Sequence, residues 1–385
     1  MRVAINATVF KNPLSGVGKR VWSLVRHAAA LRPDIHWIFL APSPVRRPDL
    51  AGVDAEWHEG GLAPEFWWKR RVVPGLLRRF GAEVYEAPWG GGLPLEGTKP
   101  CPFLATYHDT LPLDAGAWLG ERLRYRRDAR ANLRRADRIL AVSEFTRGRL
   151  VRHFHGIEAK IVVLPNGVDD RMVPQGEAAL AAFRERVLSP LGLGDFLLYL
   201  GGYNARKNVE TLLAAFAKLN RPGLRLVLAG NPNAYFKKRL APLLRRFALG
   251  DRVSTPGYLP EEDLPAWYGA SRAVVYPSLH EGFGMPVLEA LACGAPVIAH
   301  RDGAVREFAE GSALLVDARR AASLAQALED ILGGRAPGAL HRAAGIETAE
   351  SYRWSILARR YIAILEETGR LGRMGATAHG SMGEA

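Results

Sequence analysis

Short apolar runs alternate with amphipathic segments along most of this 385-residue chain. This alternation is typical of a parallel β-sheet with helices on both faces, because parallel strands must be joined by crossover connections. A weaker, polar stretch at residues 169–177 interrupts the pattern, which then starts again. The pattern predicts six strands in each half, and therefore an α/β protein with two doubly wound, Rossmann-like domains.

The interruption also sets the predicted domain bounds. We assign residues 1–172 to an N-terminal domain and residues 173–348 to a C-terminal domain. A helical pattern follows at 349–368, and Trp354 lies near its start. Residues 369–385 are rich in Gly, Ala, Met and Ser, and we predict a disordered tail there.

The formal net charge of +13 is large for a globular protein. It predicts attraction to polyanions, which include nucleic acid, an anionic membrane surface and phosphorylated substrates. The two cysteines, Cys101 and Cys293, are too far apart to suggest a disulfide framework or a metal site. The first residues lack the apolar core of a signal peptide, and no stretch approaches 18 consecutive apolar residues. We therefore expect a cytoplasmic protein.

One stretch, at residues 276–299, reads YPSLHEGFGMPVLEALACGAPVIA and predicts a strand, a tight loop, a short helix and another strand. Gly282 and Gly284 allow close approach of a ligand to the backbone, and the helix start behind them offers N–H groups to an anion. Glu281 and Glu289 can only accept hydrogen bonds when ionised, so they suit hydroxyl groups beside a phosphate. A nucleotide sugar has both groups, although Glu289 could also simply favour the helix dipole.

Other candidate residues follow strands, where ligands bind in doubly wound sheets. Arg206 and Lys207 follow the first strand of the second half; a guanidinium can bind two phosphate oxygens and an ammonium adds a point charge. His108 and Asp109 end a strand of the first half. Asp109 is either a base toward an acceptor hydroxyl or a cap of the following turn.

A short glycine motif follows the first strand. Gly16 and Gly18 lie in the sequence SGVGK, which is similar to a phosphate-binding turn, although a tight turn with no ligand is an equally good interpretation.

The whole string at 276–299, with seven residues between Glu281 and Glu289, closely resembles the signature of family 4 retaining glycosyltransferases (glycosyl transferases group 1). The resemblance extends from the Gly16 motif to Trp354. It implies the GT-B architecture, in which two Rossmann-like domains face a cleft, with the nucleotide-sugar donor on the second and the acceptor on the first. It also implies that the helix at 349–368 crosses back to the N-terminal domain.

The resemblance assigns a role to each candidate. His108 and Glu281 would contact the transferred sugar, with Asp109 as the third catalytic candidate. The donor-binding residues would be Gly16, Gly18, Arg206, Lys207, Gly282, Phe283, Gly284, Met285 and Glu289. Arg206, Lys207 and the helix start can stabilise a departing diphosphate, and no acidic pair suited to Mg²⁺ stands at a strand end. We therefore expect no metal and no cofactor besides the donor.

The runs HDTLP at 108–112 and NARKN at 204–208 look most like bacterial mannosyltransferases of polysaccharide assembly, such as that of lipopolysaccharide. The resemblance therefore favours transfer of mannose from GDP-mannose to a glycan or polyprenyl-linked acceptor, with retention. A UDP-sugar-dependent transferase of glucose, GlcNAc or galactose is the alternative. A nucleotide-sugar epimerase on the same fold is less favoured, as is a non-catalytic binding protein.

The segment at residues 65–80, EFWWKRRVVPGLLRRF, mixes aromatic and basic side chains. Such a mixture suits contact with an anionic membrane, although Pro74 interrupts a single helix and an ordinary basic surface remains the alternative. Residues 122–138 carry eight arginines and are candidates for the same face. No nucleic-acid-binding motif accompanies these patches, so we expect peripheral binding to the inner face of the cytoplasmic membrane and no nucleic acid partner.

Overall fold

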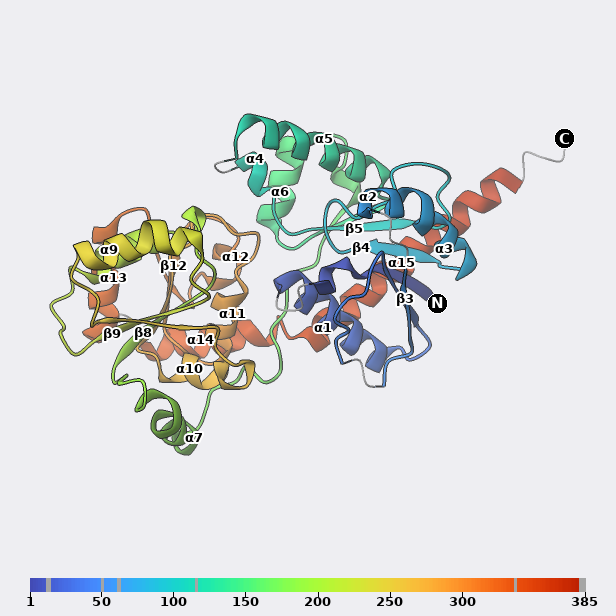
Figure 1. The fold of residues 1–385 in the computed structure, drawn as a ribbon. Helices are drawn as coiled ribbons and strands as arrows, with labels where there is room; N and C mark the ends of the chain where they lie inside the picture. The colour runs from blue at the N-terminus through green and yellow to red at the C-terminus, as the bar shows by residue number, and fades with distance from the viewer. Residues whose placement is uncertain (12–14, 50–51, 61–63, 115–116, 336–337, 381–385) are drawn as a thin grey trace. The chain divides into compact units, whose positions relative to one another are not determined.

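A computed structural model describes residues 1–11, 15–49, 52–60, 64–114, 117–335 and 338–380. The chain divides into two compact units (Figure 1). Unit 1 comprises Met1–Gly167 together with Trp354–Ala385, and unit 2 comprises Val168–Arg353. The boundaries therefore lie at 167/168 and 353/354 rather than at the predicted 172/173 and 348/349.

Unit 1 is built on a seven-stranded parallel sheet with the strand order β3-β2-β1-β4-β5-β6-β7. The strands are β1 (Arg2–Asn6), β2 (His36–Ala41), β3 (Ala55–Glu59), β4 (Val84–Ala87), β5 (Phe103–Tyr107), β6 (Arg138–Ala141) and β7 (Ile161–Val163). The sequence pattern missed β3, because this edge strand reads AEWHE and all five of its residues are only half-buried.

Helices cover both faces of this sheet (Figure 1). They are α1 (Gly16–Leu31), α2 (Glu65–Trp67), α3 (Val73–Arg79), α4 (Leu111–Asp114), α5 (Leu119–Arg135), α6 (Glu144–His153) and α15 (Trp354–Gly380). Successive residues of a strand point to opposite faces, so Val3 and Ile5 join the core beneath α1 and α15. Ala4 joins the other core, which includes Leu133 of α5 and Leu150 of α6.

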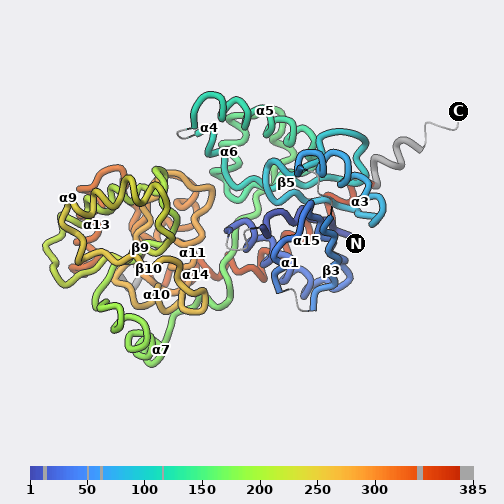
Figure 2. The backbone as a smooth tube through the Cα atoms, in the orientation of Figure 1, coloured from blue at the N-terminus to red at the C-terminus, as the bar shows by residue number. Residues whose placement is uncertain are grey.

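The last helix, α15, packs beside α1 although the whole of unit 2 separates them in sequence (Figure 2). Its buried residues recur at helical spacing, from Trp354 through Leu357 and Tyr361 to Leu365. The prediction of a disordered tail from residue 369 was wrong for residues 369–380, since α15 continues to Gly380. A Cβ atom on Gly372 would lie 2.8 Å from the ring of Pro102, so the helix still packs on unit 1 there. Residues 381–385 lie outside the described residues.

The segment at 65–80 forms consecutive helical turns, with a π-helical turn at Trp68–Val72 between α2 and α3. Pro74 lies in the first turn of α3, where its missing N–H costs little. Trp68 and Leu77 are buried in the core of unit 1, whereas Phe66 and Trp67 are exposed. Much of the apolar surface that suggested membrane contact is therefore committed to the core.

Unit 2 has a six-stranded parallel sheet with the order β10-β9-β8-β11-β12-β13. The strands are β8 (Phe196–Leu200), β9 (Arg225–Ala229), β10 (Val253–Gly257), β11 (Ala273–Tyr276), β12 (Val297–His300) and β13 (Leu314–Val316). The helices are α7 (Glu177–Phe183), α8 (Val209–Phe216), α9 (Ala241–Arg246), α10 (Leu264–Ala270), α11 (Met285–Ala292), α12 (Arg306–Ala309), α13 (Ala321–Leu332) and α14 (Gly338–Glu350). The doubly wound architecture predicted for each half is confirmed. Among the described residues, no helix is long and apolar enough to cross a membrane.

We predict that Leu365→Ala destabilises unit 1 by about 2–5 kcal/mol, because it leaves a cavity where α15 packs. Leu365 is fully buried, whereas Leu371 on the same helix is 38% exposed. Leu371→Ala is the matched control and should cost about 1 kcal/mol or less. Urea denaturation gives the free energies, and hydrogen exchange locates the loss in unit 1. Equal effects of the two substitutions would contradict this packing.

Candidate functional site

Two loops of unit 2 meet where the adjacent strands β8 and β11 end. The loop after β8 carries Arg206 and Lys207, and the loop after β11 carries Glu281. The carbonyl oxygen of Arg206 accepts hydrogen bonds from the Ser278 hydroxyl at 3.2 Å and from the Leu279 N–H at 2.8 Å. The two loops are thus joined by backbone contacts before any charged side chain is considered.

Asn208 strengthens this connection. Its φ of 56° lies in the left-handed region, which asparagine tolerates better than most residues. The side-chain amide donates to the carbonyl oxygens of Pro277 at 3.2 Å and Ala318 at 2.7 Å, and its oxygen accepts from the Thr211 hydroxyl at 2.6 Å. Strained backbone that is fixed by several contacts is common at functional sites, and here it holds the Arg206–Lys207 turn in place.

Three charged side chains form the centre of this site. Glu281 Oε1 lies 2.8 Å from Arg206 Nη1 and 2.7 Å from Lys207 Nζ. Burial favours a raised pKa for Glu281, but the charges of Lys207 and Arg206 outweigh it, so the pKa of this carboxyl is lowered and the group is ionised. The cluster therefore has one carboxylate and two cationic side chains, an excess of positive charge that suits an anionic ligand.

Lys207 is the more constrained of the two cations. Burial lowers its pKa, and Arg206 adds to this effect while Glu281 opposes it. The Lys207 ammonium donates to the Tyr276 hydroxyl at 3.0 Å and lies 5.0 Å from the centroid of the same ring. Arg206 is less enclosed, with 27% of its side chain exposed against 11% for Lys207. Arg206 is thus the cation that is better able to reach a ligand.

The glycine loop leads directly into α11. Gly284 precedes the helix with a φ of 108°, and a Cβ atom there would lie 2.6 Å from Val305 Cγ2. Only glycine fits this position without displacement. Gly282 is buried in the loop, and α11 begins at Met285, four residues after Glu281. The first N–H groups of α11 thus follow the loop that carries Glu281.

Two other predicted donor residues make contacts within unit 2. Phe283 is buried and stacks on Phe308 with ring centroids 4.9 Å apart, so its side chain supports the loop from beneath. Glu289 lies in the second turn of α11 and accepts a hydrogen bond of 2.8 Å from the Tyr268 hydroxyl. Burial raises the pKa of Tyr268 well above its usual value, which keeps this donor protonated. The bond orients the Glu289 carboxylate.

In unit 1, His108 follows β5 and its Nε2 lies 3.0 Å from the carbonyl oxygen of Pro88, just after β4. A carbonyl can only accept, so Nε2 carries the hydrogen and Nδ1 is the acceptor of the neutral ring. Burial, assisted by the charge of Arg20, lowers the pKa of His108 to about 4. The imidazole is therefore neutral at physiological pH and is suited to orienting a hydroxyl group.

Asp109, for which the sequence left two roles open, caps a turn: its Oδ1 accepts from the Leu111 N–H at 3.0 Å. Gly16 and Gly18 lie in the first turn of α1 rather than in a loop before it. The Ser15 hydroxyl accepts from the Gly18 N–H at 3.1 Å and caps this helix.

Sequence reasoning missed a buried polar network in unit 1. The Arg20 guanidinium donates to the carbonyl oxygens of Leu164 at 3.0 Å and Pro165 at 2.7 Å, and burial lowers its pKa to about 10. The Glu86 carboxylate accepts from the hydroxyls of Thr106, at 3.0 Å, and Tyr361. The sequence did contain a sign of this network. Arg20 lies four residues before Leu24, and is therefore a charged residue on the apolar side of α1.

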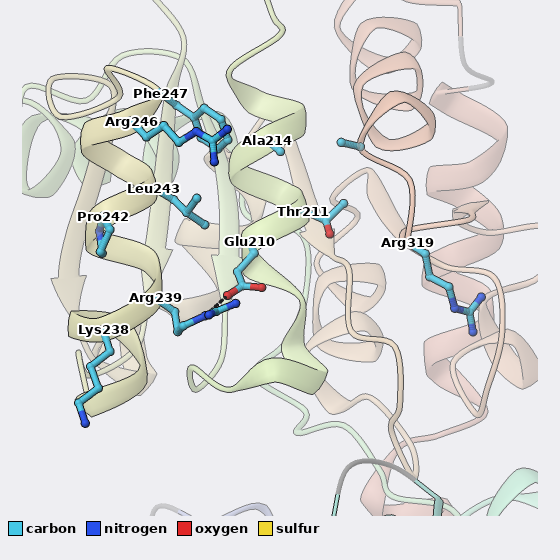
Figure 3. A pocket seen from close by; sticks show the side chains of 11 residues that line it. Glu210, Thr211, Ala214, Lys238, Arg239, Pro242, Leu243, Arg246, Phe247 and Arg319 are labelled. Atoms are coloured by element: carbon cyan, nitrogen blue, oxygen red, sulfur yellow. Dashed lines mark hydrogen bonds and ion pairs between the residues drawn. The ribbon is translucent and has the colours of Figure 1, made fainter.

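A cavity of about 560 Å³ lies beside α8 and α9 of unit 2, and Figure 3 shows the side chains that line it. It is lined by Glu210, Thr211, Ala214, Lys238, Arg239, Pro242, Leu243, Arg246, Phe247, Arg319 and Ala321, none of which is a predicted donor residue. Arg239 is paired with Glu210 at 3.0 Å, and Arg319 with Asp302 at 2.8 Å. Much of its positive charge is therefore neutralised, and we do not place the functional site there.

Fold and site together define a class: an α/β protein of two Rossmann-like units, with a cationic cluster at the start of a helix in the second. Two family comparisons agree with this class. Residues 14–171 match Glycosyltransferase Family 4, and residues 191–350 match Glycosyl transferases group 1. The chain belongs to these GT-B glycosyltransferases.

Curated relatives match over part of their length. O-antigen chain mannosyltransferase B of Escherichia coli is 29% identical over 238 residues, which are 61% of this chain and 62% of the relative. D-inositol 3-phosphate glycosyltransferase of Frankia alni is 33% identical over 244 residues, 58% of this chain and 57% of the relative. The matches thus span about six tenths of each relative.

Solved structures match over nearly the whole chain. Sucrose-phosphate synthase of Thermosynechococcus elongatus has a TM-score of 0.78 at 22% identity, covering 95% of this chain and 98% of that one. Anabaena HepE in complex with UDP-glucose has a TM-score of 0.76 at 17% identity, covering 95% and 100%. At these identities the likeness shows the shared fold.

We predict that Gly284→Ala destabilises unit 2 more than Gly303→Ala. Both glycines have positive φ, 108° and 100°, but a Cβ on Gly303 meets no atom within 4 Å. Gly303→Ala should therefore cost only the backbone strain, about 1–2 kcal/mol, and Gly284→Ala should cost about 1–3 kcal/mol more for its contact with Val305. Chemical denaturation gives both values. Equal losses would show that Val305 moves aside freely.

A second prediction concerns pH. The pKa of His108 is lowered from 6.5 to about 4, so between these values the unfolded chain takes up a proton that the folded chain does not. The unfolding free energy should thus fall as the pH drops through this window, by about 3 kcal/mol for this group. His108→Gln keeps a donor toward Pro88 but cannot titrate, so its stability should fall less. Identical pH dependence in denaturant titrations of both proteins would contradict the assignment.

Proposed function

We propose that this protein transfers a hexose from a nucleoside diphosphate sugar to an acceptor hydroxyl with retention of the anomeric configuration. Our preferred donor is GDP-mannose, and our preferred acceptor is a glycan or polyprenyl-linked glycan of cell-surface polysaccharide assembly. In this reaction the bond from the anomeric carbon to the diphosphate breaks, and a bond to the acceptor oxygen forms on the same face of the sugar. The proton of the acceptor hydroxyl leaves with the departing nucleoside diphosphate.

One observation carries the proposal: Glu281 is held between Arg206 and Lys207 in the loop that leads to α11. As the diphosphate departs it gains negative charge, which Arg206, Lys207 and the helix N–H groups can stabilise. Glu281 accepts from sugar hydroxyls, and Glu289, oriented by Tyr268, accepts from the ribose diol. In this proposal the side chains take the role that a metal ion plays elsewhere, and activity should persist with a chelator present.

His108, in unit 1, is the second catalytic candidate. Its neutral ring can accept a hydrogen bond at Nδ1, because Nε2 is committed to Pro88. We assign it the orientation of a hydroxyl on the transferred sugar. The contact of Asp109 with Leu111 favours a structural role, so we rank it below His108 and Glu281 in the chemical step.

The choice of mannose rests on the runs at 108–112 and 204–208 and on the similarity to an O-antigen chain mannosyltransferase. A UDP-sugar is the second candidate, because a fold neighbour was solved with UDP-glucose. Donor choice can be tested by thermal unfolding, since a ligand that binds only the folded state raises the midpoint. We expect a rise with GDP and GDP-mannose and little change with UDP, ADP and their sugars. A rise in midpoint with UDP compounds would identify a UDP-sugar as the donor in place of GDP-mannose. No rise with any compound would contradict the donor site.

We predict that Lys207→Ala and Glu281→Gln each lower kcat/KM by about 100-fold or more, because each removes a group that acts on the developing charge or on the sugar. Arg239→Ala is the control, since Arg239 is an exposed cation of unit 2 in the cavity of Figure 3. This control should keep kcat/KM within about twofold. Product formation from GDP-mannose and unfolding midpoints are measured together. Near-normal turnover in both variants would refute the site assignment.

A further inference from the structure

The outer side of α5 in unit 1 carries an unusual combination of side chains. Ala129 and Leu133 point into the core of the unit. A stripe of exposed residues runs beside these buried ones; it begins with apolar side chains and continues with arginines at a spacing of four. We call this set the α5 surface: Trp118, Leu119, Leu123, Arg122, Arg126 and Arg130.

The apolar end of the α5 surface is strongly exposed. Trp118 is 70% exposed, Leu119 is 69% and Leu123 is 59%. Trp118 and Leu119 are the two most exposed large hydrophobic residues within the part of the chain that the structure describes. Single exposed hydrophobic residues are common, but three together at one helix end, rimmed by charge, indicate a surface that is covered by a partner.

The charge of the α5 surface is unbalanced. Like charges four residues apart on a helix repel one another, and Arg122, Arg126 and Arg130 follow this spacing. Among the described residues, none of these three has a carboxylate within 4.0 Å. Neighbouring α6 adds Arg152, whereas Arg149 of the same helix is paired with Asp114. Burial, and then the charges of these and other nearby arginines, lower the pKa of His153 there. The region therefore attracts an extended anionic partner.

We propose that the α5 surface docks on an anionic lipid bilayer. Trp118, Leu119 and Leu123 insert at the level of the headgroups, where a tryptophan ring and aliphatic side chains leave water together. Arg122, Arg126 and Arg130 lie over the lipid phosphates. A nucleic acid would use the arginines but offers no site for two leucines, so the apolar end favours the bilayer. This inference rests on the proposed function in one respect: binding to a bilayer brings the enzyme close to a lipid-linked acceptor.

The test uses flotation of the full chain with vesicles of phosphatidylcholine, with or without about 30% phosphatidylglycerol. We expect binding to the anionic vesicles only, and release at about 0.5 M salt, where charges are strongly screened. Trp118→Ser/Leu119→Ser/Leu123→Ser should lower the partition coefficient at least tenfold. Arg126→Ala/Arg130→Ala should lower it by about fivefold per arginine.

Two sets of control variants test whether vesicle binding depends on this surface rather than on any exposed hydrophobic residue or any positive charge. Ile356→Ser and Leu191→Ser remove hydrophobic residues that are 45% and 46% exposed elsewhere. Lys237→Ala/Lys238→Ala removes two exposed cations of unit 2. All of these should bind vesicles as the wild type does. The surface variants should keep the wild-type unfolding midpoint, since they alter exposed side chains.

Unchanged flotation of both surface variants, or binding that ignores phosphatidylglycerol, would overturn the proposal. So would a wild type that binds single-stranded RNA through Arg126 and Arg130 but not vesicles. Donor binding is measured separately, by the rise in unfolding midpoint with nucleotides and no vesicles present. Loss of vesicle binding with intact nucleotide binding would therefore overturn only this inference, and the reverse result only the proposed function.

Discussion

The unit 2 site depends on the pairing of Glu281 with Arg206 and Lys207. Removing charges from water is costly, and a buried ion pair often contributes little net stability, so this cluster is better explained by binding than by folding. Its arrangement is asymmetric. Lys207 is fixed by Tyr276, whereas Arg206 retains some exposure. Glu281 is thus the internal counter-ion of a cluster that keeps an excess of positive charge.

The loops that carry this cluster are held by backbone rather than by the charges alone. The carbonyl oxygen of Arg206 and the amide of Asn208 both bond to the segment after β11. Gly284 then turns this segment into α11 at a φ that other residues adopt with difficulty. Because these contacts exist without the ion pairs, the charged groups are held in position before any ligand binds.

The sequence predicted the two parallel sheets and the unit 2 cluster, because both follow from local rules: strand–helix alternation, and charged or glycine residues directly after strands. It did not separate the roles of Asp109, because a cap and a base have the same side chain and differ only in the distance to the Leu111 N–H. It missed the network of Arg20 and Glu86 because Tyr361, which completes it, is 275 residues away from Glu86 in sequence. It ended the last helix too early because packing against Pro102 outweighs the glycine content of the tail.

Surface contacts were the hardest to predict, and adjacent tryptophans show why. Trp67 and Trp68 are chemically identical neighbours in a basic segment, yet one is 47% exposed and the other fully buried. Composition cannot distinguish them, because exposure is set by which side of a helix faces the sheet. Helix α5 is the converse case. It is rich in arginine and has few aromatic residues, yet Trp118, Leu119 and Leu123 are exposed together at its start. A binding surface therefore depends on which side of each helix faces the core, and it can be recognised only once the core residues are known.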